Sequence, residues 1–79
     1  MHSIEEFLSL SSAEQLSIVR NAGKLVLSTT VDGRHHSYYV YANFFVEVEH
    51  EEHGTTLLRI DVLRGGQKVT DMLRVLEQH

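Results

Sequence analysis

The 79-residue chain contains no cysteine, no proline and no tryptophan. Without cysteine it can form neither a disulfide nor a thiolate zinc site, two common means by which domains of this size gain stability. Three means remain: a metal held by histidine and carboxylate, a partner subunit, or the modest stability of a small core.

Long apolar runs are also missing, since no segment approaches the roughly 20 residues that a membrane-spanning helix needs. The N-terminal stretch MHSIEEFLSL carries acids where a secretory signal would carry lysines. We therefore expect a cytoplasmic protein without membrane partners. The absence of repeats, linkers and low-complexity segments predicts one small domain over residues 1–79.

The charge pattern argues against nucleic-acid binding, because seven scattered Lys and Arg residues are outnumbered by eleven Asp and Glu residues. Ser, His and Asp all occur, but nothing in the sequence fixes a nucleophile beside a base. The sequence thus predicts a protein that is not an enzyme and that has no cofactor.

Two capping-box patterns predict helical structure near the N-terminus. Ser3 and Glu6 have this spacing in a stretch that suits a short helical turn. A longer helix is predicted for SSAEQLSIVRNAG, where Ser11 with Glu14, or Ser12 with Gln15, would cap the start. Gly23 is placed to end it in a left-handed conformation.

A strand is predicted for KLVLSTTV, followed by a tight turn at Asp32-Gly33, the strongest short hairpin signal. Closing this turn sets the cross-strand pairs Val31–Arg34, Thr29–His36, Leu27–Tyr38 and Leu25–Val40.

The segment after Arg34 allows two interpretations. A turn at Ala42-Asn43 would bring His35 opposite His50, close enough to share a metal. A continuous strand, with a bend allowed at Asn43, would hold Leu25 and Leu27 on the same face as Phe44, Val46 and Val48. The turn would place these leucines with Glu47 and Glu49, and it lacks the glycine that such turns favour. We therefore predict the continuous strand.

The next strand is LLRIDVL, with predicted pairs Val48–Leu58, Val46–Ile60 and Phe44–Val62, and with an ion pair between Glu47 and Arg59. Helical spacing then predicts a C-terminal amphipathic helix from Val69, Met72, Leu73 and Leu76. The expected fold class is α+β: an N-terminal helix, a three-stranded antiparallel meander with a long central strand, and this last helix.

The stretches FLSLSSAEQ, FFVEVEHE and LRGGQKVTDML, in this order, resemble a family of small bacterial proteins with a helix, three strands and a helix. The resemblance covers nearly the whole chain and rests on packing motifs. It implies the fold and carries no functional residue with it. Gly65-Gly66 departs from this pattern, in which a Ser-Thr pair precedes the last helix.

Two features could bind small ligands. A continuous strand would place His35 and His36 beside the first turn and His50 and His53 at the far end, as two separate and solvated pairs. Each pair could hold a metal weakly with nearby acids. The RGGQK loop could present backbone N–H groups to an anion. The alternative function is therefore a metal- or anion-binding regulator.

The residues Val26, Tyr39, Tyr41 and Phe45 are expected on one sheet face that two helices would leave uncovered. Such an aromatic face is typical of association, although strands also carry half-exposed tyrosines on solvated sheets. The continuous strand would also expose half of each of its edges. We therefore expect a non-catalytic protein-binding or adaptor module, self-associating through its sheet as a homodimer.

Overall fold

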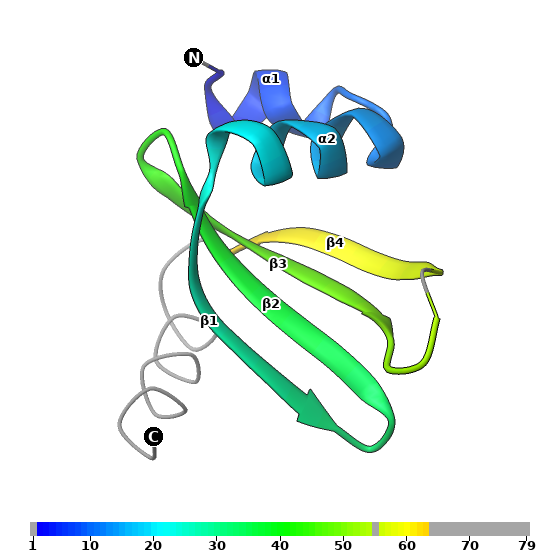
Figure 1. Ribbon diagram of the computed structural model, residues 1–79. Coiled ribbons are helices and arrows are strands. Elements are labelled where there is room, and N and C mark those ends of the chain that lie inside the picture. Colours follow the sequence, from blue (N-terminus) through cyan, green and yellow to red (C-terminus); the bar gives the residue numbers. More distant parts are fainter. Residues whose placement is uncertain (1, 55, 64–79) are drawn as a thin grey trace.

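The computed structural model describes residues 2–54 and 56–63 (Figure 1). Two helices, α1 (Ile4–Leu8) and α2 (Ser12–Ala22), precede a four-stranded antiparallel sheet. Its strands lie side by side in chain order: β1 (Lys24–Val31), β2 (Arg34–Tyr41), β3 (Phe44–Glu51) and β4 (Leu57–Leu63). The α+β arrangement and the antiparallel sheet are confirmed, but the described residues form four strands. The predicted C-terminal helix lies outside the described residues.

Both helices begin as their capping boxes predict. The Ser3 hydroxyl accepts from the Glu6 amide at 3.2 Å, and the Glu6 carboxylate accepts from the Ser3 amide at 3.0 Å. Ser11 and Glu14 form the same reciprocal pair, so Ser11 is the N-cap of α2. These bonds satisfy backbone donors that the first helical turn leaves without partners.

Gly23 ends α2 in an extended conformation, with φ of −84°, so the predicted left-handed cap is wrong. The glycine is needed for close approach instead. A Cβ atom at this position would lie 2.6 Å from the carbonyl oxygen of Val19, and the chain could not pass so near the helix. The strand β1 therefore starts directly beneath the end of α2.

The predicted long strand is wrong, because the chain turns at Ala42-Asn43 and Tyr41 pairs with Phe44. Ala42 takes the left-handed conformation, with φ of 56°, at a cost of about 1–2 kcal/mol. The turn offsets this cost because it allows all eight residues of β2 to pair with β3. It also places apolar side chains of both strands on one sheet face.

A β-bulge between Leu25 and Leu27 explains why the parity argument failed. Leu27 pairs with Tyr38 as predicted, but Leu25 pairs with Tyr39, not with Val40. The two leucines therefore face opposite sides of the sheet, and no single face had to hold both. The pairs Val31–Arg34 and Thr29–His36 are confirmed, and the Asp32-Gly33 turn has positive φ at both residues.

The predicted register of the last hairpin is shifted by two residues. Val48 pairs with Ile60 and Val46 with Val62, and a second irregularity lies between Glu49 and His50. Because a shift of two keeps side chains on their faces, Phe44, Val46, Val48, Ile60 and Val62 keep their predicted core positions. The predicted core position of Leu58 is wrong, because the second irregularity leaves Leu58 43% exposed and places Leu57 against the core instead.

Both helices cover one face of the sheet, which we call the helix-covered face (Figure 1). Phe7 of α1 and Val19 of α2 are 1% and 0% exposed, and the Phe7 ring lies 5.5 Å from that of Phe44. The buried sheet residues of this core are Tyr41, Phe44, Val46, Val48 and Val62. The other side, which we call the opposite face, carries Leu27, Tyr38, Phe45 and Leu63.

Within residues 2–54 and 56–63, neither helix is long and apolar enough to cross a membrane.

Candidate functional site

The four predicted partner-binding residues do not share an exposed face. Tyr39 and Tyr41 lie on the helix-covered face, where Tyr41 is 8% exposed and its hydroxyl lies 2.7 Å from His2 Nδ1. Phe45 lies on the opposite face, and Val26 sits at the β-bulge of β1. The turn at Ala42-Asn43 separates Tyr41 from Phe45 because it reverses the alternation of side chains. Tyr41→Glu would therefore disrupt the core, and any loss of self-association in this variant could not be distinguished from unfolding.

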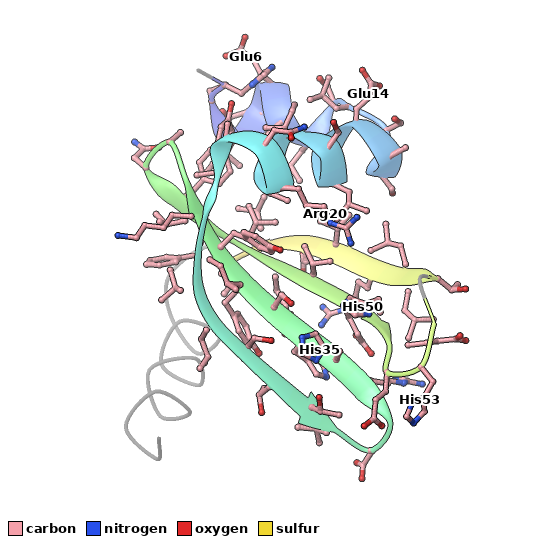
Figure 2. All side chains as sticks on the ribbon, viewed as in Figure 1. Glu6, Glu14, Arg20, His35, His50 and His53 are labelled. Carbon is pink, nitrogen blue, oxygen red and sulfur yellow. The ribbon has the colours of Figure 1, made fainter. Side chains whose placement is uncertain are left out.

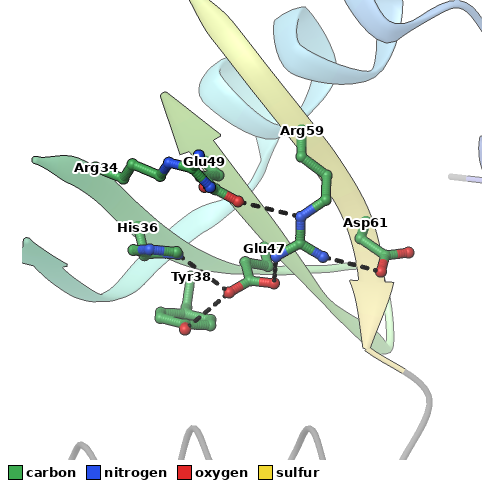
Figure 3. Close-up of polar contacts among 7 residues, drawn as sticks. All are labelled: Arg34, His36, Tyr38, Glu47, Glu49, Arg59 and Asp61. Atoms are coloured by element: carbon green, nitrogen blue, oxygen red, sulfur yellow. Dashed lines mark hydrogen bonds and ion pairs between the residues drawn. The ribbon is translucent and has the colours of Figure 1, made fainter. Parts of the chain in front are cut away.

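The opposite face carries a network of ion pairs around two buried carboxylates (Figure 3). Glu47 and Glu49 are 8% and 6% exposed. The Arg59 guanidinium lies between them, 2.7 Å from Glu47 and 3.2 Å from Glu49, which confirms the predicted Glu47–Arg59 pair. Tyr38 donates to Glu47 at 2.9 Å, and Arg34 donates to Glu49 at 3.1 Å. Each buried carboxylate thus has at least two donors.

Two further titratable residues border this network (Figure 3). Asp61 Oδ2 lies 3.5 Å from Arg59, and His36 Nδ1 lies 3.4 Å from Glu47. The His36 ring is largely buried, so the prediction of a solvated His35–His36 pair is wrong. His36 and His35 point to opposite faces because they are adjacent in a strand. The sequence signal for the network was the alternation Glu47, Glu49 on one strand and Arg59, Asp61 on the next.

The network shifts two pKa values in the directions that strengthen its ion pairs. Burial by itself would raise the pKa of Glu49, but hydrogen bonds from Arg59 and then Arg34 lower it below the ordinary value. Burial would lower the pKa of Arg59, but the charge of Glu47 and the bond to Glu49 raise it. The carboxylates are therefore held charged among donors, which suits a structural role on this face.

Acid should weaken the fold through Glu49. Its pKa is lower in the folded than in the unfolded chain, so its contribution to stability is present above the unfolded pKa. That contribution is lost as the pH falls through the folded pKa. Urea unfolding should show a free energy of unfolding that decreases below about pH 5. Glu49→Gln should be less stable than the parent at pH 7, and its free energy of unfolding should fall less steeply with decreasing pH. Glu5→Gln, on the exposed surface of α1, is the control and should show the same pH dependence of this free energy as the parent. Equal slopes in the parent and Glu49→Gln would contradict this assignment.

Two histidines meet on the helix-covered face, at the end of the sheet near the Asp32-Gly33 turn (Figure 2). His35 pairs directly with His50, and their ring centroids lie 4.9 Å apart. Ser28 and Thr30 of β1 contact the His35 ring. His53 stands apart with its side chain 91% exposed. The structure therefore joins His35 to His50, as the turn interpretation required, and separates both from His36 and His53.

Metal ligands do not gather in larger numbers in the described part of the chain. Among residues 2–54 and 56–63, no group of three or more His, Cys, Asp or Glu residues could hold a metal ion. The predicted anion-binding loop RGGQK lies outside these residues.

A hollow of about 440 Å³ beside the Asp32-Gly33 turn is lined by Asp32, Gly33, Arg34, Glu51, Glu52, His53 and Leu58.

In the part of the chain that the structure describes, β1 and β4 are the outer strands of the sheet. β2 and β3 are each paired with a neighbouring strand on both sides. The prediction of a long strand with half of each edge exposed is therefore wrong, and the exposed edges belong to the outer strands. β1 carries three exposed apolar residues, with Leu25, Val26 and Val31 exposed by 52%, 37% and 51%. From Leu27 to Val31 its pairing is regular and it carries no charged side chain. We call the side of this segment that is directed away from β2 the β1 edge.

No family model, curated protein or solved structure matches this chain. The resemblance to a family of small bacterial proteins stays a prediction.

Proposed function

We propose that the protein is a small, non-catalytic protein-binding module that associates with a second copy of itself through the β1 edge. Two β1 strands would pair antiparallel around a two-fold axis at Thr29 and join two four-stranded sheets into one. The observation that carries this proposal is the regular, uncharged and partly apolar segment Leu27–Val31 on an outer strand. Natural proteins seldom leave such an edge bare.

The β1 edge is complementary to itself. Antiparallel pairing around Thr29 sets Leu27 of each copy opposite Val31 of the other, on the opposite face of the sheet. Val31 is half-exposed in the single chain, so this contact would remove apolar surface from water twice. On the helix-covered face, Ser28 would meet Thr30 of the other copy. Small hydroxyl side chains fit that position without a clash.

Hydrogen-bonding geometry agrees with this register. In a two-residue hairpin the residues beside the turn exchange backbone bonds, and bonded pairs alternate with non-bonded pairs along the strand. Val31 and Thr29 therefore direct their backbone groups toward β2, while Ser28 and Thr30 direct theirs outward. The outward groups of Ser28 would pair with those of Thr30 in the second copy.

The charges at the two ends of β1 also complement each other. Lys24 begins the strand and Asp32 follows it in the turn, and both are exposed without an ion-pair partner among the described residues. Antiparallel pairing places each lysine near the aspartate of the other copy. β4 offers a poorer edge, because Arg59 and Asp61 lie on it and its pairing is irregular near Leu58.

Val31→Lys should abolish or strongly weaken dimer formation. The substitution would set a charged side chain against Leu27 of the second copy at two symmetric positions, and we expect the dimer dissociation constant to rise at least about tenfold. The monomer should tolerate it because Val31 is half-exposed. Sedimentation equilibrium of the full chain measures the dissociation constant directly.

Leu58→Lys is the matched control, since Leu58 is 43% exposed on the other outer strand. It should dimerise like the parent. A parent chain that remains monomeric at several hundred micromolar, or a dimer that Leu58→Lys dissociates and Val31→Lys does not, would contradict the proposed interface.

A further inference from the structure

We propose that His35 and His50 form a binding site for one divalent transition-metal ion, with Zn²⁺ as the ion that best fits two imidazoles and solvent. The two residues lie directly opposite each other on β2 and β3, and their rings are on the same face of the sheet. Both are partly exposed, so an ion and its water ligands can reach them. The site lies within one chain and does not depend on self-association.

The spacing of the rings fits a shared tetrahedral ion. Zinc binds imidazole nitrogen at about 2.0–2.1 Å, which sets the centroids of two rings on one tetrahedral ion roughly 5 Å apart. The His35 and His50 centroids are 4.9 Å apart, with the ring planes tilted by 38° (Figure 2). An ion between them would require the His35 ring to rotate away from Ser28 of β1, without movement of the strands.

The tautomer of His50 leaves a nitrogen for the metal. His50 Nδ1 lies 2.9 Å from the carbonyl oxygen of Glu51. Because a carbonyl oxygen only accepts hydrogen bonds, Nδ1 must carry the proton and donate it. Nε2 then has a lone pair. Metal-binding histidines commonly have this arrangement, in which one ring nitrogen donates to a carbonyl and the other binds the ion.

The hydroxyl groups of β1 contact both ring nitrogens of His35. Thr30 Oγ1 lies 3.0 Å from Nδ1, and Ser28 Oγ lies 2.5 Å from Nε2. A hydroxyl can donate and accept, so these contacts are compatible with either tautomer, and an ion at Nε2 would displace the Ser28 hydroxyl. The Ser28 hydroxyl can then bond to a water ligand of the ion. With Nδ1 protonated and donating to Thr30, His35 would offer Nε2 to the ion, as His50 does.

The donor set selects the class of ion. Imidazole suits Zn²⁺, Ni²⁺ and Cu²⁺, whereas Mg²⁺ and Ca²⁺ require oxygen ligands. Two protein ligands leave further positions to water, so the ion should exchange readily and could accept a ligand from outside the chain.

The test is calorimetric titration of the untagged full chain with Zn²⁺, combined with NMR of the imidazole nitrogens. We expect one Zn²⁺ per chain, with the ring nitrogens of His35 and His50 shifting together. His35→Gln and His50→Gln should each weaken binding at least about tenfold. His36→Gln and His53→Gln are the controls, since His36 faces the other side and His53 is solvated, and both should bind like the parent.

Unchanged affinity in His35→Gln or His50→Gln would overturn the site, as would loss of binding in His53→Gln. If either glutamine variant fails to fold, the zinc-dependent NMR shifts of the imidazole nitrogens in the parent chain test the site instead. Zinc-dependent shifts confined to other histidines, or no shifts at millimolar Zn²⁺, would also refute the proposal.

Discussion

Phe7→Ala is expected to lower the free energy of unfolding by about 3–5 kcal/mol, the usual cost of removing a buried phenylalanine ring. Phe7 is 1% exposed and its ring contacts those of Tyr41 and Phe44 at centroid distances of 5.9 and 5.5 Å. It anchors the short helix α1, which has only five residues and cannot be stable by itself. Removal would leave a cavity where α1 meets the sheet.

This loss should be large relative to the whole stability. A 79-residue domain has about 4–12 kcal/mol in total, so the variant should be partly unfolded or melt far below the parent. Urea unfolding followed by far-ultraviolet circular dichroism measures the change. Leu8→Ala is the matched control, because Leu8 is the next residue and is 43% exposed. Its effect should stay within about 0.5 kcal/mol. Equal losses for both variants would contradict the placement of α1.

Arg59→Ala is expected to destabilise the protein by roughly 2 kcal/mol at neutral pH. The substitution removes one cation from two carboxylates that are 8% and 6% exposed, and their charges then face each other. Breaking a fully enclosed pair costs about 3–5 kcal/mol. The smaller value applies here because the guanidinium is itself 43% exposed and already partly hydrated.

The cause can be isolated by neutralising the acids. In the Arg59→Ala background, Glu47→Gln should recover part of the lost stability, because one buried charge disappears. In the parent the same Glu47→Gln change should be destabilising, since it removes a partner of Arg59 and an acceptor of Tyr38. Urea unfolding of the four proteins forms a double-mutant cycle. Additive effects would show that the charges are not coupled.

The local signals at the starts of both helices and at the first hairpin turn were read correctly from the sequence alone. The Ser3–Glu6 and Ser11–Glu14 boxes and the Asp32-Gly33 turn depend on residues at most three positions apart. Their hydrogen bonds and backbone conformations form within that span, so no distant contact has to be known. The alternation of side chains between the two sheet faces within β3 was predicted correctly for the same reason.

Non-local choices were decided by tertiary structure. Ala42-Asn43 lacks the glycine that such turns favour, and the left-handed conformation of Ala42 is accepted because β2 and β3 then pair fully. The bulge at Val26 is likewise invisible in the pattern of β1, although it sends Leu25 and Leu27 to opposite faces.

The same choices determined the candidate sites. Once the chain turns at Ala42-Asn43, Tyr41 enters the core under Phe7, and His35 meets His50. β1 is left as an outer strand, which made its edge the proposed interface. By itself the sequence determined the class of fold, the starts of both helices and the first hairpin. Which residues share a face was decided only in three dimensions, because side-chain parity along a strand reverses at every unrecognised turn or bulge.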